Sequence, residues 1–95
     1  MTLKDLKKTL TNEEPPLGIS RALEALWYEA KGDWKQAHLR IQALDDKSSA
    51  WVHAYLHRKE KDQTNAAYWY NRAGKKIPEC SFSEEWELIA VSLLE

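Results

Sequence analysis

The chain resembles itself after a shift of 29 residues, and this weak internal repeat restricts the possible folds more than any other feature. The matched positions are an alanine, an aspartate and a second alanine: Ala25, Asp33 and Ala37 in the first copy, and Ala54, Asp62 and Ala66 in the second. In both copies the aspartate falls in a polar turn, whereas the alanines fall in apolar segments on either side. A unit of this size that occurs twice predicts stacked helical hairpins, because one hairpin alone cannot bury its apolar face.

Apolar residues recur at intervals of three and four along most of the chain, which is the spacing of one face of an α-helix. The predicted helices cover about residues 2–10, 17–31, 34–44, 49–60, 63–75 and 83–94. No segment shows the alternation of apolar and polar residues that is typical of a half-buried strand. We therefore expect an all-α fold with two helical hairpins, a closing C-terminal helix and a short N-terminal helix.

The segment TNEEPP (residues 11–16) separates the first predicted helix from the rest of the chain. Pro15 and Pro16 lack backbone N–H donors, and each disfavours a helical conformation in the residue before it. We therefore expect residues 1–16 to form a short helix and a linker that are only loosely tied to a helical domain at residues 17–95.

Aromatic residues are frequent for a chain of 95 residues, with five Trp, four Tyr and one Phe, and a small domain needs such large side chains to build a core. The segment NAAYWYNRAG (residues 65–74) contains three of them in succession. Trp69 and Tyr70 share a helical stripe with two alanines and are predicted to be buried. Their predicted core partners are Trp51 and Tyr55. Tyr68 points to the opposite side beside Arg72, so this pair is a candidate cation–π contact and binding surface.

Two segments resemble the tetratricopeptide repeat, a helical hairpin with small residues at the helix contact, a Gly-Asp turn and a closing proline. AKGDWKQAHLRI (residues 30–41) matches the turn and the second helix, and EKDQTNAAYWYNRAGKKIP (residues 60–78) matches from the turn to the proline. The departures are Lys61 in place of the usual glycine, Ser49 in place of a proline, and a shift of 29 residues rather than about 34. The resemblance covers about residues 20–78 and implies a tetratricopeptide-like stack.

The phrases ALWYEAKGDW and AWVHAYLHRKEKDQTNAAYWYNRAG also resemble a family of small, uncharacterised bacterial proteins with no established activity.

In the stacked hairpins that the tetratricopeptide resemblance implies, the first helix of each pair lines a concave groove. By this resemblance the groove would be lined by Glu24, Tyr28, His53, His57 and Glu60. The implied function is binding of a protein or peptide partner, or of a second copy of the chain in a homodimer. The candidate binding residues are Tyr28, His53, His57, Tyr68 and Arg72.

His53 and His57 stand four residues apart on one predicted helix, a spacing that allows two ring nitrogens to bind one metal ion. The motif reads HAYLH, so Ala54 stands where a zinc protease carries its catalytic glutamate. His38 and Cys80 could add ligands only if the fold brought them near. The sequence therefore leaves two interpretations open: a solvated or groove-lining histidine pair, or a face that binds a metal or a small molecule.

Other functions lack the residues that they need. Fourteen Lys and Arg against fifteen Asp and Glu leave a formal charge of −1 with no basic tract, so we expect no nucleic-acid partner. No apolar run suggests a signal peptide or reaches the roughly 18 residues of a membrane span, so we expect no membrane partner. The single Cys80 permits no internal disulfide, which favours the cytoplasm. No activated nucleophile or phosphate-binding loop is evident, so we expect neither an enzyme nor a cofactor.

Overall fold

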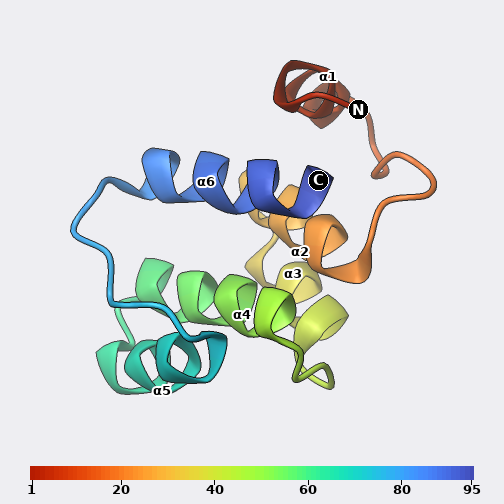
Figure 1. Cartoon of the computed structure of the whole chain (residues 1–95). Helices are drawn as coiled ribbons and strands as arrows, with labels where there is room; N and C mark the ends of the chain where they lie inside the picture. Colours follow the sequence, from red (N-terminus) through yellow and green to blue (C-terminus); the bar gives the residue numbers. More distant parts are fainter.

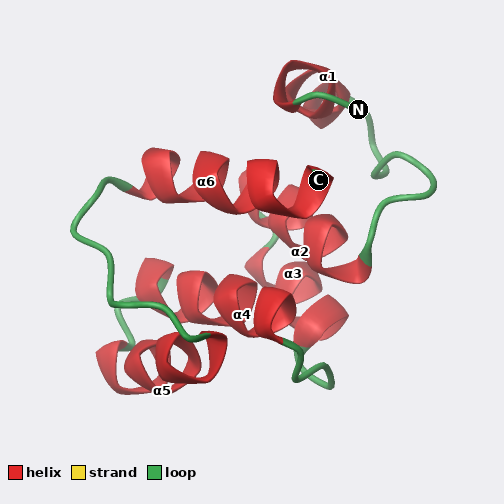
Figure 2. Ribbon diagram, viewed as in Figure 1, coloured by secondary structure: helices red, strands yellow, loops and turns green.

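The computed structural model describes residues 1–95, and every regular element in it is helical (Figure 2), which confirms the all-α prediction. In chain order the elements are α1 (Leu3–Lys8), the short 3-10 helix η1 (Thr9–Thr11), α2 (Arg21–Ala30), α3 (Trp34–Ile41), α4 (Lys47–Lys59), α5 (Gln63–Ala73) and α6 (Phe82–Leu94). None of these helices combines the length and the apolar character needed to cross a membrane.

Helix α2 begins later than the apolar pattern predicts, and a side-chain cap explains why. The hydroxyl of Ser20 accepts a hydrogen bond from the backbone N–H of Leu23 (3.1 Å), so the helix begins at Arg21 rather than at Leu17. Gly18 has a φ of 85°, a left-handed conformation that cannot continue into a right-handed helix. The apolar residues before the cap therefore belong to the linker.

The hairpins α2–α3 and α4–α5 turn in the same way, which is the structural basis of the internal repeat. Gly32 and Lys61 occupy equivalent positions, with φ values of 85° and 65°. The residue after each, Asp33 or Asp62, accepts a hydrogen bond from the backbone of the following helix and so caps it. Lys61 is the one non-glycine residue with a positive φ, and it occupies the position that glycine has in the first hairpin.

Helix α6 lies across α2 and α4 (Figure 1). Its residues Trp86, Ile89 and Ala90 are buried in the main core cluster, which also contains Trp27 of α2. The Trp86 ring donates from Nε1 to the backbone carbonyl of Leu26 (3.0 Å). Helix α6 therefore covers one side of the first helices, whereas His53 and His57 of the predicted groove lie toward α3 and α5.

Helix α1 is not loosely tied to the rest of the chain, so that expectation is wrong. Leu6 is fully buried in the main core cluster, and α1 contacts α6. The hydroxyl of Thr9 accepts a hydrogen bond from Nε1 of Trp27 (3.0 Å). The ammonium of Lys31 donates to two backbone carbonyls near the start of the linker, at 2.6 and 2.8 Å. One apolar anchor and three hydrogen bonds thus hold the N-terminal segment in place.

A buried carboxylate joins α6 to the second hairpin. Glu85 is 1% exposed and accepts hydrogen bonds from the hydroxyl of Tyr70 (2.6 Å to Oε2) and from Nε1 of Trp51 (3.2 Å). The guanidinium of Arg58 lies 2.8 Å from the other carboxylate oxygen. Burial, followed by the hydrogen bond to Glu85, raises the pKa of the Tyr70 hydroxyl far above its usual value, so Tyr70 stays a donor.

The aromatic segment of α5 follows the prediction in part. Tyr70 is buried in a small cluster at the α4–α5 contact, with Trp51 at its edge. Trp69 is only partly buried and stacks on His53 of α4, with ring centroids 3.9 Å apart. Tyr55 belongs to the separate main cluster. The two predicted core rings therefore contact α4 at different places.

Candidate functional site

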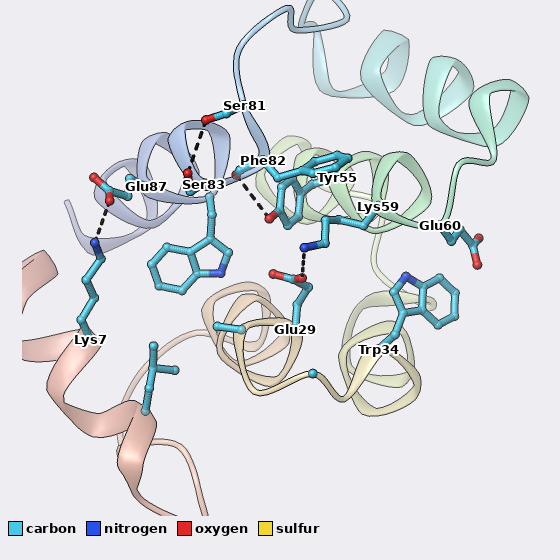
Figure 3. Close-up of a pocket in the computed structure, with 14 residues that line it drawn as sticks. Lys7, Glu29, Trp34, Tyr55, Lys59, Glu60, Ser81, Phe82, Ser83 and Glu87 are labelled. Carbon is cyan, nitrogen blue, oxygen red and sulfur yellow. Dashed lines mark hydrogen bonds and ion pairs between the residues drawn. The ribbon is translucent and has the colours of Figure 1, made fainter.

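A cleft of about 1030 Å³ opens between α6, the C-terminal ends of α2 and α4, and the N-terminal segment (Figure 3). Five large apolar side chains from four elements line it: Leu10, Trp34, Tyr55, Phe82 and Trp86. Phe82, at the start of α6, packs against the last turn of α4, where Cζ of Arg58 lies 4.6 Å from its ring centroid. A cavity of this size and lining is suited to an apolar group of a ligand.

Two ion pairs line the cleft (Figure 3). Lys7 Nζ lies 2.6 Å from Oε2 of Glu87, and Lys59 Nζ lies 3.3 Å from Oε2 of Glu29. The ammonium of Lys59 also lies 5.1 Å from the centroid of the Phe82 ring, which is 40% exposed at the rim. The site therefore combines an apolar interior with charges of both signs at its edge.

The binding residues predicted from the sequence do not line this cleft. Tyr28 packs against α3, where Cζ of Arg40 lies 4.9 Å from its ring centroid. Of the residues expected in the groove, Glu60 is the one that lines the cleft. The residues that sequence reasoning missed come from every helix except α5, and no local pattern shows that these distant segments meet.

The predicted Tyr68–Arg72 pair forms on the surface of α5. Tyr68 is 54% exposed, and its hydroxyl accepts a hydrogen bond from Nη1 of Arg72 (3.4 Å). Cζ of Arg72 lies 5.9 Å from the Tyr68 ring centroid and 5.6 Å from that of Trp69. The contact is local to one helix and lines neither the cleft nor the smaller cavity around Ser20, Leu44 and Leu93.

The three histidines of the chain meet at the contact between the two hairpins. His38 comes from α3, whereas His53 and His57 come from α4. Nε2 of His38 and Nε2 of His53 are 3.0 Å apart, and one ring nitrogen from each of the three residues lies within 4.8 Å of the others. The fold thus brings in His38, but Cys80 is not part of the cluster.

The histidine pair is neither solvated nor part of a groove, so these expectations are wrong. His53 and His57 are 4% and 8% exposed, because the α3 and α5 sides of α4 are both covered. Trp34 stacks on His38 with ring centroids 4.8 Å apart, and Trp69 covers His53. The apolar pattern alone hides this burial, since His53 and His57 lie outside the two predicted stripes of α4.

Hydrogen bonding in the cluster is uneven. Nδ1 of His57 donates a hydrogen bond to Oε1 of Glu60 (2.6 Å), whereas Nδ1 of the buried His53 has no hydrogen-bond partner. Burial lowers the pKa of His53 to about 3, with the neighbouring His38 and His57 acting in the same direction. Burial also lowers the pKa of His38. His53 and His38 are therefore neutral near pH 7, which is the form that binds metal ions.

The cluster and the cleft share two residues. Trp34 stacks on His38 and also lines the cleft, and Glu60 binds His57 and also lines the cleft (Figure 3). The two sites are therefore neighbours around the end of α4.

No protein-family model, curated protein or solved structure matches the chain. The resemblance to tetratricopeptide repeats therefore depends on residues 30–41 and 60–78 alone. Function has to be inferred from the cleft and the histidine cluster themselves.

Proposed function

We propose that the protein is a non-enzymatic, tetratricopeptide-like module that binds a segment of a partner protein in the cleft beside α6. The observation that carries the proposal is the cleft itself, an aromatic cavity with charged walls at the open end of the first helices. Large apolar pockets of this kind accept the anchor side chains that dominate protein interfaces.

The hairpin geometry supports the tetratricopeptide-like part of the proposal. Both hairpins use the same turn, with a positive φ followed by an aspartate cap, and their first helices α2 and α4 contact each other. Helix α6 packs against both of these first helices, and the cleft lies beside its first two turns.

The chemistry of the cleft indicates the kind of segment that it binds. Phe82 and Trp86 offer aromatic contacts for one large apolar side chain, which would be desolvated on entering. The paired charges at Lys59–Glu29 and Lys7–Glu87 favour a segment with charged residues of both signs beside that anchor. Cys80 is a free thiol, which suits a partner in the reducing cytoplasm.

A matched pair of substitutions on α6 tests the proposal. Phe82→Glu alters the rim of the cleft, and a glutamate in the first turn of a helix is compatible with folding. Leu88→Glu alters an exposed leucine of the same helix that does not line the cleft. We expect a partner captured from a lysate of the source organism to be lost with Phe82→Glu and retained with Leu88→Glu, as measured by calorimetry with the purified partner.

Two outcomes would contradict this function. A partner that binds both variants equally would lie elsewhere on the surface. Repeated empty captures, together with thermal stabilisation by a small molecule, would replace the peptide ligand with a metabolite. A captured species that proves to be a second copy of the chain would make the occupant a homodimer partner.

A further inference from the structure

We propose that His38, His53 and His57 form a binding site for one divalent transition-metal ion, with Zn²⁺ as the ion of best fit. The three histidines lie outside the peptide-binding cleft, although Glu60, which holds His57, also lines that cleft. It joins α3 of the first hairpin to α4 of the second.

The spacing of the ring nitrogens fits a tetrahedral ion. Zn–N bonds of 2.0–2.1 Å place neighbouring ligand nitrogens about 3.3 Å apart. Nε2 of His38 and Nε2 of His53 are already 3.0 Å apart, and a nitrogen of His57 lies within 4.8 Å of both. Binding of the ion would have to draw the third nitrogen in to bonding distance.

The carboxylate of Glu60 supplies the outer contact that such a site requires. A metal-binding histidine commonly donates its other ring N–H to a carboxylate, which fixes the tautomer and aims the remaining lone pair at the metal. Nδ1 of His57 makes this contact with Oε1 of Glu60 at 2.6 Å, and Oδ2 of Asp62 lies 4.0 Å from the same nitrogen. This contact holds the His57 ring through Nδ1 and would leave Nε2 as the nitrogen that binds the ion.

The three rings form one cluster that is shielded from water. Trp34 stacks on His38 and Trp69 stacks on His53, so tryptophan rings cover two of the three histidines. Aliphatic or aromatic side chains would fill the same space between Trp34 and Trp69 without the cost of burying imidazole nitrogens. One ring nitrogen from each histidine lies within 4.8 Å of the others, close enough for one metal ion to draw the three together.

The ligand set decides the class of metal. Imidazole nitrogens suit Zn²⁺, Cu²⁺ and Ni²⁺, whereas Mg²⁺ and Ca²⁺ require oxygen ligands. Three histidines leave a fourth position for water or a nearby carboxylate oxygen, a common zinc arrangement. Because the ligands come from both hairpins, the ion should stabilise the folded chain.

Metal titration of the full chain tests the site. After removal of metals with a chelator, we expect Zn²⁺ to bind with one ion per chain and to raise the melting temperature. His38→Gln should weaken Zn²⁺ binding more than about tenfold, and Glu60→Gln should weaken it about tenfold. Cys80→Ser, which removes the one thiol outside the cluster, should leave the affinity unchanged.

Nitrogen NMR of the histidine rings makes the test independent of how the variants fold. In the unmodified protein one equivalent of Zn²⁺ should shift the ring signals of all three histidines together. Ring signals that stay unchanged, a melting temperature that does not respond to one equivalent of Zn²⁺, or binding that survives in folded His38→Gln would overturn the proposal.

Discussion

At the scale of single residues, the adjacent Glu84 and Glu85 differ in burial, and the sequence does not predict which of them is buried. Glu84 is exposed in the first turn of α6, where an acidic side chain is expected near the positive end of the helix. Glu85 is buried and bonded to residues of α4 and α5. Nothing local distinguishes the two residues, because the partners of Glu85 are 15 to 34 residues away.

The buried carboxylate leads to a first prediction about stability. Glu85→Ala leaves Arg58 without its ionic partner and Tyr70 without its acceptor, so we expect the free energy of unfolding to fall by about 3–5 kcal/mol. The matched control Glu84→Ala should cost less than about 1 kcal/mol, because that side chain is exposed. Urea denaturation followed by circular dichroism measures both values. Equal losses in the two variants would show that the buried contacts contribute little.

The depressed pKa of His53 leads to a prediction about pH. In the metal-free protein the folded chain takes up this proton near pH 3, whereas the unfolded chain takes it up near 6.5. The unfolded state therefore binds more protons between these values, so stability is complete above about pH 6.5 and falls as the pH is lowered. We expect His53 to contribute a loss of roughly 2 kcal/mol between about pH 7.5 and about pH 5.

The variant His53→Gln provides the comparison for that loss. It cannot take up the proton, so its free energy of unfolding should fall by less over the same pH interval. His38, whose pKa is also lowered, and His57 face the same ring and remain in both proteins. An acid-induced loss of the same size in both proteins would rule out His53 as its cause.

At the scale of helices and turns, local chemistry is enough to predict most of the fold. Capping serines and aspartates mark the starts of α2, α3, α5 and α6, and apolar spacing identifies their buried faces. The exceptions have local causes too, since Gly18 and the Ser20 cap delay α2. The attachment of α1 was not predictable in this way, because it depends on Leu6 entering a core built by distant helices.

The repeated turn gives a prediction at this scale. Lys61 holds a φ of 65°, where a side chain with a Cβ atom is strained, so Lys61→Gly should stabilise the protein by about 0.5–1 kcal/mol. The reciprocal change Gly32→Ala places a Cβ atom at a φ of 85° in the equivalent turn and should destabilise it by about 1 kcal/mol or more. Thermal denaturation of both variants checks the signs. A destabilised Lys61→Gly would mean that the lysine side chain itself contributes to the turn.

At the scale of the whole molecule, both candidate sites depend on how distant helices pack. The spacing of His53 and His57 was visible in the sequence, but the approach of His38 required α3 to pack beside α4. The cleft depends even more on tertiary structure, since every helix except α5 contributes residues to its lining. Periodicity predicts which helices form, whereas their long-range arrangement depends on the packing of the complete core.

The proposed function places a partner protein in the cleft beside α6. Site-specific photo-crosslinking in the native cell tests it most directly, with the photoreactive amino acid placed at Phe82 in one protein and at Leu88 in another. Both positions are exposed on α6, but only Phe82 lines the cleft. If the partner binds in the cleft, we expect a discrete crosslinked partner from position 82 and none from position 88. Crosslinks from position 88 alone, or none from position 82, would contradict it.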